Sequence, residues 1–365
     1  MATAKSTLTP IQQALTASLS SGPAQKLEDA HYRLRPQKYW SPGAGGTWQS
    51  IRPAEIPSDT SLDSPFDTKA IRLLSWNIDV LVGFAEERMH AALKYLEQLV
   101  SSSPSDVAIV IFLQEMGQSD LEQIRNSTWI KKRFNITDVY NSHWLSPLYG
   151  TTTLVDQRLH INNVFRVPWI SKFHRDGLFV DIGLSHPESQ SGDAKVLRLC
   201  NTHLESLVAD PPVRPLQLAA AAEYLQQPEV ACALLAGDLN AIQPFDRTLH
   251  VENNLDDAYL DLGGTEDSDE GYTWGQQVPQ WMKDTFGCSR MDKILFRGEV
   301  RPNKFARIGM GVKVAENVRE EVEKEIDGGW VTDHYGVMGN FELQSEWRLH
   351  SLSSGGGQAM KSKLS

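Results

Sequence analysis

The stretch CALLAGDLNAI, residues 232–242, is apolar for five residues and then changes abruptly to glycine, aspartate and asparagine. Such an apolar run is typical of a buried strand. Asp238 and Asn240 are two residues apart, so on an extended chain their side chains point to the same face. Taken alone, the stretch is best interpreted as a polar turn that closes a strand, because Gly, Asp and Asn are the usual turn residues.

Five other apolar runs also carry a carboxylate, a carboxamide or an imidazole at one end. Each of these residues, taken singly, has an ordinary explanation as a turn or loop residue. Neighbouring strand ends in a sheet lie about 5 Å apart, so a set of such ends can converge on one pocket. The residues are Asn77 and Asp79, Gln114 and Glu115, Asn201, His203 and Glu205, Asp292, and Asp333 and His334.

Residues 69–344 alternate strand-like and helix-like patterns and predict a single α/β domain. The continuous apolar run at 107–114 is typical of a central strand that is buried on both faces. Apolar residues at helical spacing predict a helix over 86–100, and high helix propensity predicts another over 214–226. Further strands are expected at 71–76, 150–155, 161–167, 178–184, 196–201, 232–236, 292–296 and 335–341.

The two ends of the chain differ in composition from this domain. Residues 1–68 are rich in Ser, Pro, Thr and Gly and predict a partly ordered N-terminal arm. Within the arm we expect a short helix at 10–20 and a loop with two aromatic anchors at 39–48. Residues 345–365 contain a Ser- and Gly-rich stretch and predict a flexible C-terminal tail.

Composition and charge limit the possible function classes. The net charge of −11 argues against a general nucleic-acid coat protein, since such proteins are usually basic, but it suits a protein that binds a hard divalent cation. No window approaches the roughly 18 apolar residues of a membrane helix, and no secretory signal pattern is present. Three cysteines, an odd number, argue against a disulfide framework. We therefore expect an intracellular monomer in the nucleus, the cytoplasm or both.

The residues at the strand ends have the chemistry needed for attack of water on a phosphoester. Glu115 and Asn77 offer the hard oxygens that Mg²⁺ prefers. Asp238 can orient and deprotonate a water molecule, and Asn240 can hold the same site by a carboxamide hydrogen bond. These residues predict a hydrolytic site with a metal.

Two histidines complete this inventory. His203 and His334 can donate to phosphate oxygens or stabilise developing negative charge, and Asp292 can fix the tautomer of a neighbouring histidine. No serine or cysteine stands out as a nucleophile, and no glycine-rich phosphate loop is present. The chemistry that fits is metal-assisted hydrolysis of a phosphodiester or a phosphomonoester.

Six short blocks, in this order, resemble the endonuclease/exonuclease/phosphatase family of Mg²⁺-dependent phosphoesterases. The resemblance spans about residues 71–341 and implies the family fold, two stacked β-sheets flanked by helices in a four-layer α/β sandwich, with the site at one edge. The blocks are Trp76-Asn77, Leu113-Gln114-Glu115, Asn201-Thr202-His203-Leu204, Gly237-Asp238-Leu239-Asn240, Met291-Asp292 and Asp333-His334.

The resemblance also implies a role for each residue. Glu115, Asn77 and Asp333 would form the metal site, for Mg²⁺ with Mn²⁺ as a substitute. Asp238 and Asn240 would position the attacking water. The full catalytic set would be Asp238, Asn240, His334, His203 and Asp292, with the two histidines contacting the phosphate and Asp292 supporting His334.

Within the family, the blocks SWNID, IFLQE and NTHLES are most similar to the tyrosyl-DNA phosphodiesterase 2 branch. That branch hydrolyses 5′-phosphotyrosyl bonds between DNA and trapped topoisomerase II, so DNA with a 5′-tyrosyl adduct is the expected substrate. In that branch Arg and Asp follow the Gly-Asp-x-Asn block, whereas Ala241 and Ile242 follow it here. The basic contact would then be missing, or Arg247 or Arg290 would supply it.

Trp274 and Asn201, together with Arg290, form the expected substrate-binding set. Trp274 lies in a segment similar to the substrate wall of that branch, where it could stack on a base or line the groove. A core aromatic is an equally good interpretation of Trp274.

Two other functions stay open at this point. The first is a family phosphoesterase that acts on an RNA end, a nucleotide or a phospholipid headgroup, which the negative charge and the missing arginine allow. The second is a pseudoenzyme that uses the fold as a binding scaffold. It is disfavoured because a competent residue occupies every expected catalytic position.

Overall fold

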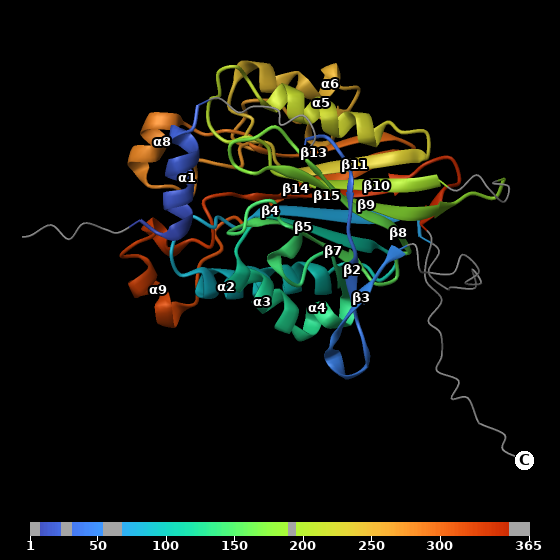
Figure 1. Ribbon diagram of the computed structural model, residues 1–365, viewed down its shortest axis with the longest axis horizontal. Helices are drawn as coiled ribbons and strands as arrows, with labels where there is room; N and C mark the ends of the chain where they lie inside the picture. The colour runs from blue at the N-terminus through green and yellow to red at the C-terminus, as the bar shows by residue number, and fades with distance from the viewer. Residues whose placement is uncertain (1–7, 23–30, 54–67, 189–194, 350–365) are drawn as a thin grey trace, which may run out of the picture.

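Two β-sheets of eight strands each are stacked face to face, and helices cover both outer faces (Figure 1). The computed structural model describes residues 8–22, 31–53, 68–188 and 195–349. This arrangement confirms the predicted four-layer α/β sandwich. None of the helices in these ranges is both long and apolar enough to cross a membrane.

The first sheet contains the strand that ends at Asn77 and the strand that ends one residue after Glu115. Its central strands β4 and β5 are parallel, and Asn77 lies opposite Gln114 in their register. In order across the sheet, the strands are β14 (Val300–Ile308), β15 (Gly336–Leu343), β4 (Ala70–Asn77), β5 (Ala108–Met116), β7 (Gly150–Asp156), β6 (Phe134–Ile136), β2 (Tyr39–Pro42) and β3 (Trp48–Ile51).

The second sheet contains the strand of the CALLAGDLNAI stretch. Its strands β10 and β11 are parallel, and β13 runs antiparallel to β11. In order, the strands are β1 (Arg35–Pro36), β8 (Ile161–Pro168), β9 (Asp176–Ser185), β10 (Lys195–Thr202), β11 (Val230–Asp238), β13 (Asp292–Gly298) and β12 (Asp256–Asp257), and β16 (Arg348–Leu349) pairs with β9.

The helices divide between the two outer faces. Apolar residues of α2, α3 and α4 pack on the β4–β5 sheet, and those of α5 and α6 pack on the β10–β11 sheet (Figure 1). The helices are α1 (Pro10–Ser20), α2 (Ala85–Ser101), α3 (Gln118–Asn126), α4 (Thr128–Arg133), α5 (Arg214–Leu225), α6 (Leu249–Glu252), α7 (Ala258–Asp261), α8 (Gln280–Phe286) and α9 (Glu316–Val322).

The main core lies between the two sheets. Phe112 of β5 and Leu234 of β11 belong to this core and are fully buried. Strand β5 is apolar on both faces because its other face lies under α2 and α3, which explains its continuous apolar run. Strands β5 and β11, one in each sheet, place their polar carboxyl ends at the same edge of the sandwich.

Most expected elements are present with boundaries that differ by one or two residues. The helix expected at 10–20 is α1. The loop expected at 39–48 is wrong, because β2 and β3 form an antiparallel hairpin there, with Trp40 buried. The hairpin extends the edge of the first sheet by pairing with β6. The flexible tail expected at 345–365 lies outside the described residues from 350 onward.

Candidate active site

Strands from both sheets bring the predicted site residues to one edge of the sandwich. In the first sheet β4 ends at Asn77, and its neighbour β5 carries Glu115. In the second sheet β11 ends at Asp238, and Asp292 at the start of β13 is its register partner. β10 ends directly before His203. The edge predicted from the polar strand ends is therefore present.

A hydrogen bond joins the two sheets at this edge. The side-chain amide of Asn77 donates from Nδ2 to Oδ2 of Asp238 over 3.0 Å, and both residues are buried. The other oxygen of Asp238, Oδ1, accepts from the backbone N–H of Asn240 at 2.8 Å. The Asn77 carbonyl Oδ1 accepts from the backbone N–H of Asp79 at 2.9 Å. Asp238 is thus held in place at both of its oxygens.

The backbone at this edge takes unusual conformations. Gly237 has a φ of 153°, and a Cβ there would lie 1.7 Å from the carbonyl oxygen of Thr202. Only glycine allows β11 to approach β10 this closely. Glu115, Asn240 and Asp79 have φ values of 52°, 47° and 56°, in the left-handed region that side chains rarely occupy. Such strained residues cluster at functional sites.

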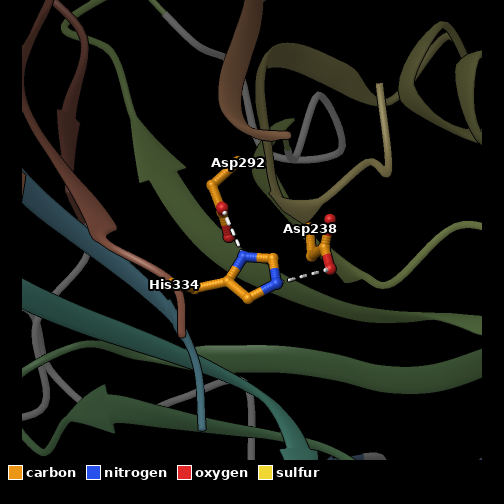
Figure 2. A group of neighbouring side chains, drawn as sticks. All are labelled: Asp238, Asp292 and His334. Atoms are coloured by element: carbon orange, nitrogen blue, oxygen red, sulfur yellow. Dashed lines mark hydrogen bonds and ion pairs between the residues drawn. The ribbon is translucent and has the colours of Figure 1, made fainter. Parts of the chain in front are cut away.

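His334 lies between two carboxylates, as Figure 2 shows. Its Nδ1 is 2.8 Å from Asp292 Oδ2, and its Nε2 is 3.7 Å from Asp238 Oδ2. His334 precedes β15 by two residues, so the first sheet supplies the imidazole and the second sheet supplies both carboxylates. The three residues form a relay in which Asp292 orients His334 towards Asp238.

Burial and charge set the protonation states of this relay. Burial alone would lower the pKa of His334, but Asp292 and Asp238 raise it well above its ordinary value. Burial would raise the pKa of Asp238, but His334 and His203 hold it well below its usual range. Burial raises the pKa of Asp292 to about 6, against the lowering effect of His334. Asp238 is therefore an ionised acceptor beside a cationic imidazole.

His203 approaches Asp238 from the other side. Its Nε2 is 3.3 Å from Asp238 Oδ2 and 3.8 Å from Glu115 Oε1. Its Nδ1 is 2.7 Å from Nη1 of Arg175. Burial, and then the Arg175 charge, lower the pKa of His203. The site thus combines one cationic imidazole, His334, with one whose pKa favours the neutral form.

Three acidic residues, Asp79, Glu115 and Asp333, gather next to these histidines. Burial raises the pKa of Asp79 to about 8, and the negative charges of Asp333 and Glu115 add to this effect. Asp333 Oδ2 accepts a hydrogen bond from Trp274 Nε1 at 2.7 Å. Crowded carboxylates of this kind are relieved by a divalent cation, and their oxygens are the ligands that a hard cation prefers. The predicted ligands Asn77, Glu115 and Asp333 therefore fit a metal.

A second group, Asp238, Asp292 and His334, could also be taken for a metal site, because one ligand atom from each lies within 4.8 Å of the others. The contacts of His334 argue for the relay instead. The ring nitrogens of His334 face different carboxylates, and an ion on either nitrogen would displace one of these contacts. The Glu115 side therefore stays the predicted position of the metal.

Two of the remaining predicted residues lie at the site. Trp274 is 8% exposed and holds Asp333, so it is a buried aromatic that also contacts the predicted metal site. Its ring centroid is 6.4 Å from that of Phe286 on α8. Asn240 donates from Nδ2 to the Leu204 carbonyl at 3.1 Å, which ties the two loops together.

The other two predicted substrate residues are held by partners inside the fold. Asn201 is fully buried between the sheets, where it accepts from Gln114 Nε2 and donates to the backbone carbonyl of Thr152. Arg290 is 3% exposed and pairs with the carboxylates of Asp257 and Glu266. Both side chains are committed to internal partners, and their contact with a substrate stays a prediction.

A neighbouring cavity of about 270 Å³ lies beyond Asn240. Arg247, the alternative basic contact, lines it and is paired at 2.8 Å with Asp267; both side chains are 53% exposed. Arg290, Lys293 and Ser289 also line this cavity. This cavity is lined by polar residues and lies next to the predicted catalytic edge.

One residue of the site was not identified from the sequence. Arg175 directly precedes β9 and lines a small cavity with Glu115, Tyr149 and His203. The sequence places it at the start of the apolar run RDGLFVDIGL, where a lone arginine gives no signal of its own. The sequence offers one clue: Arg175 is a charged residue at the start of a predicted strand, in a domain where other strands also carry polar residues at their ends.

The comparisons with known proteins agree with this geometry. A family model described as the Endonuclease/Exonuclease/phosphatase family matches residues 74–334, which include all six blocks. The chain belongs to this family. Enzymes of the family are metal-dependent phosphodiester hydrolases, so the chain is an enzyme of this class and uses a divalent metal ion. A comparison with curated protein sequences finds no match.

Solved structures with a similar fold include several of TDP2, tyrosyl-DNA phosphodiesterase 2. A humanized D. rerio TDP2 is 19% identical with a TM-score of 0.55, over 76% of this chain and 100% of that chain. A truncated Caenorhabditis elegans TDP2 is 20% identical with a TM-score of 0.55, over 75% and 98%. An endonuclease/exonuclease/phosphatase from Beutenbergia cavernae is 16% identical with a TM-score of 0.51, over 76% and 72%. These similarities show the fold.

Proposed function

We propose that this protein is a Mg²⁺-dependent phosphodiesterase that hydrolyses the 5′-phosphotyrosyl bond between DNA and a trapped topoisomerase II. The observation that carries the proposal is the position of Asp238, which Asn77 and Asn240 hold between His334 and His203, beside the acidic cluster. The blocks SWNID, IFLQE and NTHLES support this substrate. So does the fold shared with D. rerio TDP2, one structure of which is complexed with single strand DNA product.

In this reaction Asp238 orients a water molecule and accepts one of its protons. The water oxygen attacks phosphorus, and the bond between phosphorus and the tyrosyl oxygen breaks. DNA keeps the phosphate at its 5′ end, and the tyrosyl oxygen takes up a proton to regenerate the hydroxyl. The low pKa of Asp238 keeps it ionised before the attack, so that orientation of the water is its first task.

The two histidines act on the phosphate. The N–H groups at Nε2 of His334 and His203 point into the region around Asp238 and can donate to phosphate oxygens as negative charge develops. Asp292 holds His334 in this orientation through Nδ1. When bound by Glu115, Asn77 and Asp333, Mg²⁺ would supply a compensating positive charge next to the phosphate.

A substrate panel tests this proposal. With Mg²⁺ present, the full chain is assayed on a 5′-phosphotyrosyl oligonucleotide, a 3′-phosphotyrosyl oligonucleotide, an abasic duplex, poly(A) and sphingomyelin. We expect the highest kcat/KM on the 5′-phosphotyrosyl oligonucleotide. A preference for any of the other four would overturn the proposed substrate and identify the substrate class that replaces it.

A further inference from the structure

Arg88 of helix α2 is a buried cation that binds the backbone of its neighbours. The side chain is 2% exposed, and within the described residues its guanidinium donates five hydrogen bonds, all to backbone carbonyls. The acceptors are the carbonyls of Gly83 at 2.9 Å, Ile78 at 2.8 Å, Val331 at 2.7 Å, Asp79 at 2.7 Å and Val82 at 3.1 Å. A guanidinium has five N–H donors, so each one is used. Arg88 therefore has one defined position.

These carbonyls belong to two segments that carry residues of the acidic cluster. Four of them lie in residues 78–84, the β4–α2 loop, which follows Asn77 and contains Asp79. The fifth belongs to the segment before β15, residues 330–335, where Val331 precedes Asp333 by two residues. The two segments are far apart in the sequence, and the single guanidinium of Arg88 joins them.

The β4–α2 loop is in direct contact with a predicted metal ligand. The backbone N–H of Val80 donates to Oε2 of Glu115 at 3.2 Å. The backbone of this loop is also strained, because Asp79 and Phe84 each have a φ of 56°, in the left-handed region. Such conformations persist only where surrounding contacts hold them. The hydrogen bonds of Arg88 to both halves of the loop are contacts of this kind.

We propose that Arg88 is a positioning residue that holds the β4–α2 loop and the segment before β15 together, so that the predicted metal ligands lie where a divalent cation can bind them. This inference rests on the proposed function, in which that cation is Mg²⁺. Arg88 acts through the backbone of the two segments and not on the cation or the substrate. Helix α2 anchors it, because the apolar face of α2 packs on the first sheet.

The charge and the hydrogen bonds of Arg88 have opposite effects on a bound cation. The positive charge repels a divalent cation, so removal of the charge alone would strengthen metal binding. The hydrogen bonds hold the two segments in place, so their loss would weaken metal binding. Arg88→Met removes both the charge and the donors. Arg88→Lys keeps the charge, but its ammonium has only three donors on one atom and cannot reproduce the planar fork that reaches five carbonyls.

Binding of Mn²⁺ alone to the full chain, without substrate, tests the proposal. Electron paramagnetic resonance measures the free Mn²⁺ in a titration and so gives the Kd, and the binding that Glu115→Gln weakens is assigned to this site. We expect Arg88→Met and Arg88→Lys each to raise this Kd by about 10-fold or more, as is typical when a group that supports metal ligands is lost. Arg88→Lys is the test variant if Arg88→Met does not fold. A Kd equal to or below the wild-type value in a folded Arg88 variant would overturn the proposal.

Two control variants separate this role from general stability and from net charge. Leu96→Ala changes a fully buried residue two turns further along α2, so it should lower the free energy of unfolding and leave the Mn²⁺ Kd unchanged. Arg301→Met removes an arginine that also binds backbone carbonyls, those of Gly298 and Val300, and should likewise leave the Kd unchanged. A rise in Kd in Leu96→Ala as large as in the Arg88 variants would overturn the proposal.

Failure of the proposed function gives a different result. If the wild type binds Mn²⁺ but prefers another phosphoester in the substrate panel, the proposed substrate fails and the role of Arg88 stands. If Glu115→Gln binds Mn²⁺ as tightly as the wild type, the proposed metal site fails, and the role of Arg88 is overturned with it. If Glu115→Gln weakens binding and the Arg88 variants do not, only the inference about Arg88 fails.

Discussion

The side-chain amide of Asn77 donates a 3.0 Å hydrogen bond to Asp238 and joins the ends of two strands that belong to different sheets. Each sheet alone therefore carries an incomplete site. The packing of the two sheets through the shared core positions the ends of β4 and β11 relative to each other. Stability of the sandwich and geometry of the catalytic edge are consequently linked.

Removing this amide should impair catalysis more than folding. Asn77→Ala leaves the buried charge of Asp238 without one of its donors, and a hydrogen bond to a charged group contributes about 1.5–3 kcal/mol. We expect kcat/KM to fall about 10- to 100-fold at saturating Mg²⁺. The matched control is Asn135→Ala, another buried asparagine on β6, which should keep its activity. Equal activity losses in the two variants would argue against a specific role for Asn77.

Gly237 should tolerate no side chain. A Cβ would lie 1.7 Å from the Thr202 carbonyl oxygen, and the φ of 153° is itself unfavourable for other residues. Gly237→Ala should lower the free energy of unfolding by at least about 2 kcal/mol, measured by urea denaturation. Gly263→Ala is the control, because Gly263 has a positive φ of 88° but open space around it, and it should cost only about 1 kcal/mol. Similar losses in both variants would show that the close approach of β10 and β11 is unimportant.

Asp120 should make stability depend on pH. Burial raises its pKa to about 6, against the hydrogen bond from the Gly117 N–H and the charge of Arg88. The folded state therefore binds this proton more tightly than the unfolded state, whose aspartate has a pKa of about 3.9. The contribution of Asp120 to the unfolding free energy is then highest below about pH 4, falls between about pH 4 and 6, and stays constant above that.

The variant Asp120→Asn keeps the acceptor for Gly117 and removes the titration. Relative to wild type, its free energy of unfolding should rise between about pH 4 and 6.5 by up to about 3 kcal/mol. Urea denaturation at several pH values measures this difference. A difference that is independent of pH would show that Asp120 titrates normally.

Much of the fold follows from local signals in the sequence. The runs at 107–113 and 232–236 are apolar at every position because helices and the other sheet cover the two faces of each strand. The hairpin of β2 and β3 was missed, because its pairing partner β6 is distant in sequence and its own residues look like a turn-rich loop. Pairing across such distances leaves little trace in local composition.

The sequence predicts the site residues that lie at the ends of strands. It does not predict the residues whose contacts form only when distant parts of the chain pack together. Asn77, Glu115 and Asp238 interrupt apolar runs, and that contrast marks them in the sequence. Arg290 was predicted to contact the substrate; its ion pairs with Asp257 and Glu266 form only in the fold, and it also lines the cavity beyond Asn240. Arg175 belongs to the site only through its contact with His203, which is 28 positions away.

Glu115 should be needed mainly for the metal. Glu115→Gln keeps the shape of the side chain but replaces a negatively charged oxygen by a neutral amide, so binding of a hard cation should weaken. We expect the Mg²⁺ concentration for half-maximal activity to rise by about 10-fold or more, with activity largely recovered at high Mg²⁺. An unchanged Mg²⁺ titration would contradict the assignment of Glu115 as a ligand.

The central claim is that Asp238 accepts the proton of the attacking water, and turnover of a 5′-phosphotyrosyl oligonucleotide by Asp238→Asn tests it most directly. The variant keeps the shape of the side chain and removes the proton acceptor, so kcat should fall about 10²- to 10⁴-fold with an unchanged melting temperature. Asp120→Asn, a buried aspartate outside the site, should turn over at the wild-type rate. Near-normal turnover by a folded Asp238→Asn variant would contradict the account.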